Sequence, residues 1–403
     1  MKKVAIIAPN SLPVPPIRGG GIQTVLSEIA PLYREYKPYI FSNCEYGIDK
    51  LPLRETDGNI EHHRICLSGW EEFKVQLMHL TTRNYFPYVR EISKQIMEIR
   101  PDIVHVMNRP WFLPILRKYL GPNIKIINHH HNHYFAEMSA RKVSYYLSLM
   151  DAFAGISNFT VMEEMIKRFP MQADRCFTIY NGINTDKFKP KWMNKEKADQ
   201  TRKRFKIDKG DLVLMFAGRL RKEKGIHTLL KAASTIIKKN KKVKLLIVGS
   251  HFYKADDKKT AYIQNLKKLA EPIRQSVIFT GFIPPAQMPE IYAASDILIV
   301  PSHADAFGLT YAEAASVGLP AIGSKLGGIL EVIDDAETGF LMKDPENADE
   351  LISLINFLMN NPDKMRAFGE AGRKKVENMF SAQSSAANTE EMYNKVLTFP
   401  DRS

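Results

Sequence analysis

PSHADAFGLTYAEAASVGLPAIGSKLGGILE, residues 301–331, contains a tight turn that joins a strand to a helix. The preceding run ILIVPS is β-branched and apolar, which is typical of a buried parallel strand. Residues 309–317 predict a helix. The short join at Phe307, Gly308 and Leu309 directs unpaired backbone N–H groups and the positive end of the helix dipole beyond the end of the strand. This arrangement predicts a phosphate-binding site.

Two carboxylates flank this turn. Asp305 precedes it, and Glu313 lies in the predicted helix with two acceptor oxygens suited to a pair of hydroxyl groups. Each one alone is also explained by helix capping or by the helix dipole. The glycine pair Gly327-Gly328 favours the ligand interpretation, because glycines after the next strand allow the backbone to approach a ligand in the same crevice. A phosphate, a diol and a second acceptor together describe a nucleotide sugar.

Strand-like runs alternate with helical patterns along the whole chain, which predicts parallel sheets covered by helices on both faces. A Lys-rich, proline-punctuated break over residues 184–211 divides the strands into two series. We therefore expect an α/β protein with two doubly wound, Rossmann-like domains. Their predicted ranges are 1–183 and 184–380, and a C-terminal helix within about 381–403 is expected to pack back on the first domain.

Composition narrows the class of protein. The chain has 403 residues, is 44% hydrophobic and 25% charged, and lacks an apolar run of membrane-spanning length, which is typical of a soluble globular protein. Three scattered cysteines without metal-ligand spacing favour reduced thiols in the cytoplasm. The formal net charge of +13 fits phosphate-bearing substrates or peripheral membrane association, and without a recognisable module we expect no nucleic-acid partner.

Three further stretches carry candidate ligand-binding residues. The glycine run GGG at 19–21 follows the first predicted strand, so Gly20 and Gly21 could bring backbone N–H groups close to a ligand. After another strand, Arg219 could bind two phosphate oxygens with its guanidinium group while Lys224 supplies a point charge. Arg219 directly follows Gly218 at a strand end, where ligand sites concentrate, so a plain basic surface loop explains it less well.

A histidine cluster closes the predicted strand that begins at residue 124. His129, His131 and His133 alternate along the chain, so a metal site is one interpretation. No nearby cysteine or carboxylate completes a ligand set, which favours a histidine that binds a sugar hydroxyl. His105, within IVHVM, is expected to be a core residue.

The motifs GRLxxxKG, AFGLxxxEA with an acidic residue eight positions before its glutamate, and GG together resemble glycosyltransferase family 4. That family contains retaining nucleotide-sugar enzymes of the GT-B fold, with two Rossmann-like domains facing each other across a cleft. The resemblance covers nearly the whole chain. LPVPPIRGGGIQ, HVMNRPWFLP and HNHYFA are similar to the spore-coat branch of the family.

The resemblance implies a role for each candidate residue. Arg219 and Lys224 would hold the donor diphosphate, Glu313 the ribose hydroxyls, and Asp305 the donor sugar. Phe307, Gly308 and Leu309 would offer backbone N–H groups, and the loop at Ile283 would flank the base. From the first domain, Gly20 and Gly21 would approach the donor and His131 would bind the transferred sugar. No cofactor and no metal would be required.

Asp305 departs from the family pattern, which usually has glutamate at this position. The shorter side chain predicts an altered choice of donor sugar or a lower rate. Two functions therefore compete: a glycosyltransferase acting in cell-surface or spore-coat glycan synthesis, and an inactive coat protein on the same scaffold. A phosphorylase or epimerase of the same fold stays possible. The acceptor, a glycan, lipid or protein, is not specified, although loops within residues 60–85 and 134–149 are where it would bind.

Overall fold

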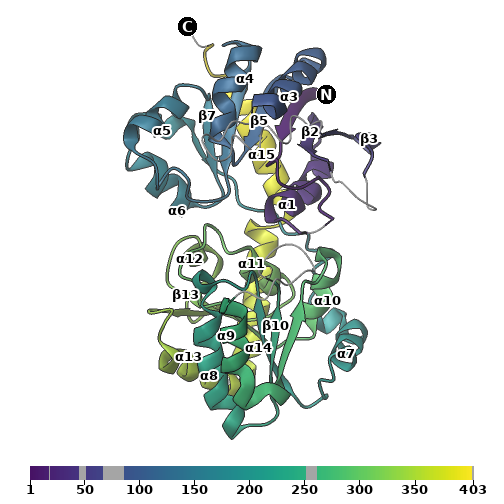
Figure 1. The fold of residues 1–403 in the computed structure, drawn as a ribbon, viewed down its shortest axis with the longest axis vertical. Helices are drawn as coiled ribbons and strands as arrows, with labels where there is room; N and C mark the ends of the chain where they lie inside the picture. Colours follow the sequence, from purple (N-terminus) through teal and green to yellow (C-terminus); the bar gives the residue numbers. More distant parts are fainter. Residues whose placement is uncertain (18, 45–50, 67–85, 251–260, 402–403) are drawn as a thin grey trace. The chain divides into compact units, whose positions relative to one another are not determined.

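The structure is a computed structural model that describes residues 1–401 except 18, 45–50, 67–85 and 251–260. The chain divides into two compact units (Figure 1). Unit 1 comprises Met1–Gly182 and Ala382–Ser403, and unit 2 comprises Ile183–Ser381. The part of the predicted acceptor region that spans residues 67–85 lies outside the described residues.

Unit 1 is built on an eight-stranded sheet in the described part of the chain, in the order β3-β4-β2-β1-β5-β6-β7-β8. Neighbouring strands are parallel except for β3, which runs antiparallel to β4. The strands are β1 Lys2–Ile7, β2 Tyr36–Asn43, β3 Arg54–Asp57, β4 Ile60–Ile65, β5 Ile103–Met107, β6 Lys125–His130, β7 Ala152–Gly155 and β8 Cys176–Thr178. The α-helices are α1 Gly21–Ile29, α3 Phe86–Ile99, α4 Leu113–Leu120, α5 Ala140–Leu147, α6 Asn158–Val161 and α15 Ala382–Leu397.

Unit 2 has a six-stranded, all-parallel sheet among its described residues, in the order β11-β10-β9-β12-β13-β14. The strands are β9 Leu212–Ala217, β10 Val243–Val248, β11 Val277–Gly281, β12 Ile297–Ile299, β13 Ala321–Ser324 and β14 Gly339–Met342. The α-helices are α7 Lys195–Arg204, α8 Ile226–Lys239, α9 Ala261–Ala270, α10 Met288–Ala293, α11 Leu309–Ser316, α12 Ile329–Val332, α13 Ala348–Asn360 and α14 Pro362–Met379. The strand order reverses between β9 and β12, which is where ligands bind in sheets of this kind.

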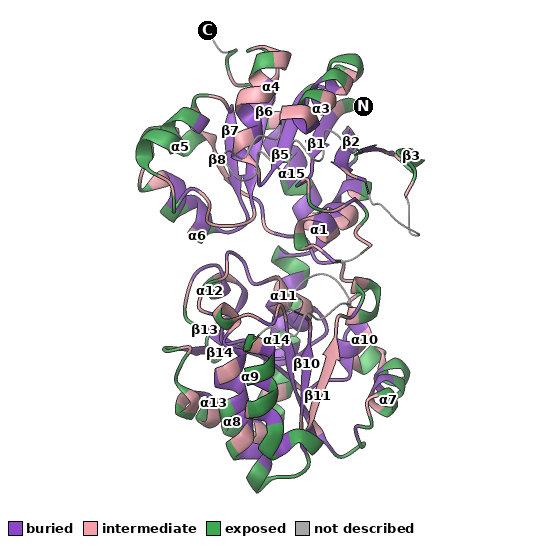
Figure 2. Ribbon diagram, viewed as in Figure 1, coloured by how far each residue is buried: buried purple, intermediate pink, exposed green. Residues whose placement is uncertain are grey.

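The sheets form the cores of the two units: most of their strands are buried, whereas the outer faces of the helices are exposed (Figure 2). Parallel strands covered by helices on both faces are apolar along their whole length. β9 follows this rule, since Val213, Leu214, Met215 and Phe216 are all fully buried. The prediction of two doubly wound α/β sheets is confirmed.

Three strands were not predicted. β3, with the sequence RETD, is fully exposed at the sheet edge, and β4, IEHHRI, carries polar side chains, so neither shows an apolar pattern. Arg64 of β4 is buried because its guanidinium donates to the carbonyl groups of Val14 and Pro52. β14 has only four residues. Apolar periodicity does not detect strands whose buried polar groups find partners elsewhere in the fold.

The prediction that all three cysteines are reduced is wrong. Cys44 and Cys66 form a disulfide, and Cys176 is free. The pairing follows from sheet topology, because β2 and β4 are parallel neighbours in which Asn43 pairs with Ile65. The two cysteines directly follow these residues and therefore leave the sheet side by side.

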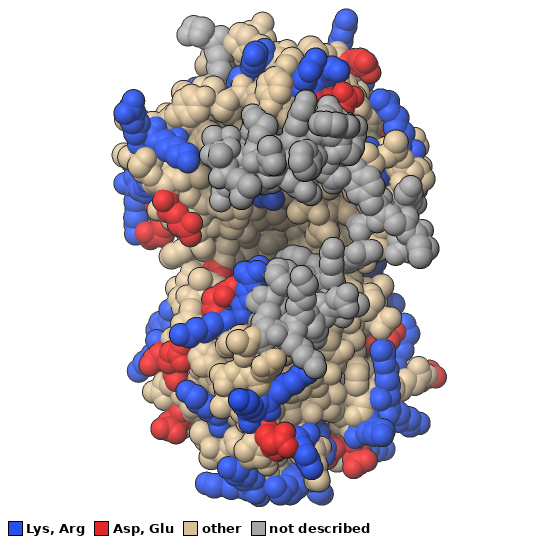
Figure 3. Space-filling view, in the orientation of Figure 1, with Lys and Arg blue, Asp and Glu red and all other residues tan. Residues whose placement is uncertain are grey.

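No helix in the described ranges is long and apolar enough to cross a membrane. Lysine and arginine side chains are scattered over the visible faces of both units and do not form one continuous stripe there (Figure 3).

The C-terminal helix α15 packs against α1 within unit 1. Its Tyr393 is fully buried and makes edge contacts with the rings of Tyr33 and Tyr36. Glu390 Oε1 accepts hydrogen bonds from the backbone N–H groups of residues 34, 35 and 36, at 2.9, 2.8 and 3.2 Å. The carboxylate of Glu390 is thus the common hydrogen-bond acceptor for three consecutive backbone N–H groups at the start of β2.

We expect Glu390→Ala to destabilise unit 1 by about 2–3 kcal/mol, because the buried N–H group of Tyr36 and two partly buried N–H groups would lose their acceptor. Urea denaturation monitored by circular dichroism measures this change. The exposed neighbour Glu391 serves as the control, and Glu391→Ala should leave stability nearly unchanged. Equal stability of the two variants would contradict the role given to Glu390.

Candidate functional site

The candidate site of unit 2 lies at the carboxyl ends of β9 and β12. These strands are parallel neighbours, with Leu298 paired to Met215. The chain therefore leaves β9 through Gly218 and Arg219 at the same sheet edge at which it leaves β12 toward Asp305. Strand order reverses between the two, so the predicted basic and acidic residues lie at the switch point of the sheet.

Lys224 and Asp305 form an ion pair at this edge. Lys224 Nζ lies 2.7 Å from Asp305 Oδ2, and the two side chains are 18% and 20% exposed. The other carboxylate oxygen, Oδ1, accepts hydrogen bonds from the backbone N–H groups of Gly308, at 2.9 Å, and Phe307, at 3.4 Å. The anion-binding end of α11 is therefore occupied by a side chain of the protein itself, and Leu309 begins the helix directly behind it.

Backbone contacts fix the position of this pair. Lys224 ends the 3₁₀ turn Lys222–Lys224. Within this turn, the carbonyl oxygen of Glu223 accepts two hydrogen bonds from the loop that leads to Asp305. The donors are the backbone N–H of His303, at 2.8 Å, and Ser302 Oγ, at 3.2 Å. Gly225 follows with φ +66°, and a Cβ atom there would lie 1.8 Å from the carbonyl oxygen of Pro301. Only glycine permits this approach. The turn is thereby attached to the loop that carries Asp305.

The glycine pair Gly327-Gly328 packs against the same loop. A Cβ atom on Gly327 would lie 2.4 Å from the carbonyl oxygen of Asp305, and one on Gly328 would lie 2.2 Å from that of Ala306. Gly328 N–H also donates to the Asp305 carbonyl at 3.1 Å. Here the close backbone approach is made to the protein's own loop, so this pair supports the position of Asp305.

Glu313 lies in α11 and accepts a hydrogen bond from Tyr292 Oη at 2.8 Å. Burial raises the pKa of Glu313 to about 7, and the hydrogen bond from Tyr292 opposes this shift. Near neutral pH the carboxyl group therefore gains or loses a proton easily. Only its ionised form offers acceptors to two hydroxyl groups at once.

The remaining predicted residues of unit 2 are placed by their strands. Arg219 is partly exposed and directly follows Gly218. The backbone of Gly249 packs closely against Gly218, because a Cβ atom on Gly249 would lie 2.0 Å from the Gly218 carbonyl oxygen. Ile283 follows β11 and is 8% exposed. Because β10 separates β11 from β9, the sheet order does not bring Ile283 beside the ion pair.

In unit 1, the glycine loop opens α1. Gly20 has φ +114°, and a Cβ atom there would lie 2.6 Å from Gln23 Oε1, so the loop requires glycine. Gly21 is the first residue of α1. The loop follows β1, which lies between β2 and β5, the switch point of the first sheet.

His131 follows β6, and its backbone N–H donates to Asn108 Oδ1 at 3.1 Å. Its ring lies 4.4 Å from that of His129, and His129 stacks in turn on His105. Burial, together with the neighbouring His105 and His130, lowers the pKa of His131 to about 3. The ring is therefore neutral, with one donor and one acceptor nitrogen.

Two of the other histidines, His105 and His133, have hydrogen-bonding partners in the protein. His105 Nδ1 lies 2.7 Å from Tyr393 Oη, in agreement with its predicted place in the core. β6 ends at His130, so the alternation does not continue, and His133 Nδ1 instead lies 3.1 Å from Glu164 Oε1. Glu164, a fully buried carboxylate in the π-helical turn Met162–Ile166, was not predicted, because the pair Glu163-Glu164 is typical of an exposed helix face.

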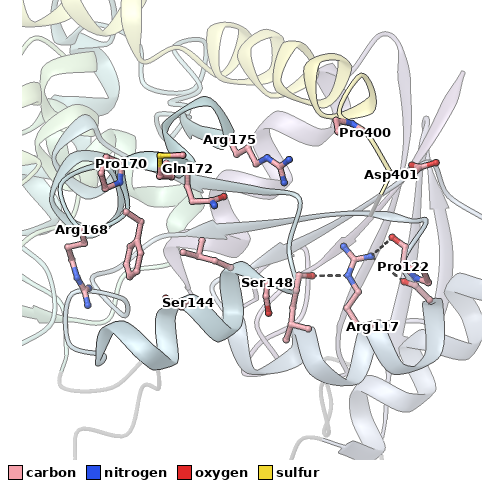
Figure 4. Close-up of a pocket in the computed structure, with 15 residues that line it drawn as sticks. Arg117, Pro122, Ser144, Ser148, Arg168, Pro170, Gln172, Arg175, Pro400 and Asp401 are labelled. Atoms are coloured by element: carbon pink, nitrogen blue, oxygen red, sulfur yellow. Dashed lines mark hydrogen bonds between the residues drawn. The ribbon is translucent and has the colours of Figure 1, made fainter. Parts of the chain in front are cut away.

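A cavity of about 990 Å³ lies in unit 1 and is lined partly by Arg117, Arg168, Ser144 and Pro400 (Figure 4). Arg117 donates to the carbonyl groups of Leu149 and Pro122, and Arg168 donates to that of Met138. These arginines are held by the backbone, so the cavity is not our candidate for the phosphate site.

The fold and this site together define a class of protein. The structure matches a glycosyltransferase from Rickettsia africae with a TM-score of 0.78 and 21% identity, over 99% of both chains. It matches Anabaena HepE, solved with UDP and glucose, with a TM-score of 0.73 and 19% identity, over 98% of this chain and 100% of that one. These matches show the GT-B fold.

Sequence comparison identifies the family. The family model for glycosyl transferases group 1 matches residues 197–375, and that for Glycosyltransferase Family 4 matches residues 57–187. Spore coat protein SA of Bacillus subtilis is 28% identical over 398 residues, 98% of this chain and 99% of that protein. A lipopolysaccharide 1,2-N-acetylglucosaminetransferase of Salmonella typhimurium is 25% identical over 401 residues, 97% of this chain and 98% of that one.

The chain belongs to glycosyltransferase family 4, whose members are retaining enzymes, and it is a glycosyltransferase that uses a nucleotide-sugar donor. The resemblance inferred from the sequence motifs is confirmed.

Glu313 should make stability depend on pH. Its pKa is near 7 in the folded protein and near 4.5 in the unfolded chain, so between these values the folded state binds the extra proton. Stability from this group is therefore lost as pH rises from about 5 through 7. In Glu313→Gln this component should vanish, which thermal denaturation across that range would measure.

Glu337→Gln, at an exposed position, is the control and should keep the pH dependence of the unsubstituted protein. Identical pH profiles for Glu313→Gln and the unsubstituted protein would contradict a raised pKa at Glu313.

Proposed function

We propose that this protein transfers a sugar from a nucleoside-diphosphate sugar to a hydroxyl group of a glycan, lipid or protein, with retention of configuration and without a metal in the chemical step. Unit 2 would be the donor domain and unit 1 the acceptor-side domain. The observation that carries the proposal is the Lys224–Asp305 pair at the N-terminus of α11, where an anion already binds a cation and two backbone N–H groups.

The diphosphate would take over the positive groups of this site. Lys224 would exchange the Asp305 carboxylate for a phosphate oxygen, and Arg219 would bind two further oxygens with its planar guanidinium. The N–H groups at Phe307, Gly308 and Leu309 would face the same charge. Asp305, released from Lys224, would accept a hydrogen bond from a hydroxyl of the donor sugar.

The nucleoside would lie along α11 and the adjoining strand ends. Ionised Glu313 would accept hydrogen bonds from both ribose hydroxyls, while Tyr292 holds its carboxylate in place. The loop at Ile283 would flank the base. From unit 1, the backbone at Gly20 and Gly21 would approach the donor, and neutral His131 would exchange a hydrogen bond with the transferred sugar.

In the reaction, the bond between the anomeric carbon and the phosphate oxygen breaks, and its electron pair goes to the diphosphate. Arg219, Lys224 and the helix dipole stabilise the negative charge that develops there. The acceptor oxygen bonds to the anomeric carbon on the same face. Its proton passes to the leaving phosphate.

Relatives support UDP as the first donor to test, since HepE was solved with UDP and glucose. The full-length similarity to a spore coat protein supports a role in cell-surface or spore-coat glycan synthesis, with the protein in the cytoplasm, at a membrane surface or in the coat. Among these locations, the Cys44–Cys66 disulfide favours the coat over the reducing cytoplasm.

A coat protein without activity is the second candidate. It is favoured by Asp305, whose short carboxylate is engaged by Lys224 and Gly308 in this structure. The two functions differ in a simple respect, because a protein without a donor site would bind no nucleoside diphosphate.

Isothermal titration with UDP, GDP and ADP tests the proposal. We expect micromolar binding of one of them, unchanged by EDTA. Arg219→Ala and Lys224→Ala should each weaken it by roughly tenfold to a hundredfold, the value of a hydrogen bond between charged groups. Lys222→Ala is the matched control, because Lys222 lies in the same turn and is exposed, and it should bind like the unsubstituted protein.

The absence of binding to all three diphosphates would overturn the proposal and favour the coat-protein function. Equal losses in Lys222→Ala and Lys224→Ala would show instead that the turn contributes only a diffuse positive charge.

A further inference from the structure

We propose that His227, His303 and Glu346 form a binding site for one divalent transition-metal ion of the zinc class in unit 2. Among the described residues this is the one group of three histidine, cysteine or acidic side chains whose ligand atoms lie close enough to share an ion, within 4.8 Å of one another. None of these three residues is among the donor-binding residues proposed above, so the metal site can be tested independently of them.

The two imidazole rings face one carboxylate. His227 Nε2 lies 2.9 and 3.1 Å from the two oxygens of Glu346, and His303 Nε2 lies 3.2 Å from Oε1. The rings are nearly parallel, with an angle of 12° and a centroid distance of 6.3 Å. Ligand atoms that bind zinc at about 2.0–2.1 Å in a tetrahedron are roughly 3.3 Å apart. The separations of the two histidine nitrogens from Glu346 are close to this value, and all three ligand atoms lie within 4.8 Å of one another.

The state of His303 supports a ligand role. Its Nε2 atom is shielded from solvent and makes no hydrogen bond, although Glu346 Oε1 lies near it. A buried polar atom without a hydrogen bond is costly, and a metal ion is one group that can satisfy it.

A further residue orients His227. Its Nδ1 atom lies 3.2 Å from Tyr262 Oη in α9, on the far side of the ring from Glu346. A histidine that binds a metal through one nitrogen usually donates its other N–H to an oxygen atom. Tyr262 Oη is placed to accept a hydrogen bond from Nδ1–H, which would fix the tautomer in which the unprotonated Nε2 faces the ion.

The donor set selects the metal. Two imidazole nitrogens and one carboxylate suit zinc and its neighbours, whereas magnesium and calcium prefer oxygen ligands alone. The side chain of Glu346 is 45% exposed and that of His303 is 32% exposed, so solvent can reach the ion as a fourth ligand.

The ion would connect three separate segments. His227 lies in the first turn of α8, just after Lys224 and Gly225, while His303 lies two residues before Asp305. Glu346 lies in the loop between β14 and α13. The metal would therefore fasten the turn and the loop that carry the Lys224–Asp305 pair to a third element of the unit.

The test uses full-length protein stripped of metal by a chelator and then dialysed. Titration with Co²⁺, followed by visible absorption, should give the bands of a tetrahedral site at one equivalent, and Zn²⁺ should abolish them. Glu346→Gln and His303→Gln should weaken Zn²⁺ binding by roughly a hundredfold or more, because each removes a side chain that binds the ion directly. This loss should exceed that caused by removing a residue that only hydrogen-bonds a ligand. Tyr262→Phe, which keeps the ligands, should lose about tenfold.

Glu337→Gln is the matched control and should bind Zn²⁺ like the unsubstituted protein. Thermal denaturation of each metal-free variant checks that it is folded, and Zn²⁺ should raise the melting temperature of the unsubstituted protein but not that of Glu346→Gln. Equal Zn²⁺ affinity in Glu346→Gln and the unsubstituted protein, or no binding to the latter, would overturn the proposal and leave an ion-paired surface cluster. UDP titration of the stripped protein reports on the donor site separately.

Discussion

The ion pair between Lys224 and Asp305 is the constraint on which the candidate site of unit 2 depends. Its two side chains come from the ends of neighbouring strands, and each end is fixed by backbone atoms that approach more closely than any side chain would allow. Gly225 permits the contact with Pro301, and Gly327 permits the contact with Asp305. Such packing restricts the backbone to one conformation. As a consequence, the cation of Lys224 and the N-terminus of α11 are held beside the same carboxylate. The internal carboxylate at that point is the reason why we propose that the donor phosphate binds there.

Much of this arrangement was predictable because it is local or follows from strand ends. The run ILIVPS, the turn at Gly308 and the helix at 309–316 are adjacent in sequence, and the all-parallel topology brings Arg219 to the same sheet edge. Prediction failed where partners are distant in sequence. The buried polar strand β4 and the Cys44–Cys66 disulfide depend on sheet order that apolar periodicity does not reveal. The close approach of Gly327 and Gly328 was predicted, but its partner is the protein's own backbone.

The same limit explains why other side chains were missed. Tyr292 holds Glu313, and Glu164 holds His133, across different secondary-structure elements. His303 lies within the stretch that shaped the whole interpretation, yet its partners His227 and Glu346 are far away in sequence and no spacing motif joins them. Burial then changes their chemistry, as the neutral His131 and the raised pKa of Glu313 show. The residue type was visible in the sequence, whereas its protonation state was not.

The central claim is that a donor diphosphate replaces Asp305 as the partner of Lys224. A crystal structure of the protein with UDP, or with whichever diphosphate binds best, tests this claim most directly. We predict that a phosphate oxygen lies within hydrogen-bonding distance of Lys224 Nζ and the N-terminus of α11, and that Asp305 has left Lys224. A diphosphate bound elsewhere, with the Lys224–Asp305 pair intact, would contradict the account.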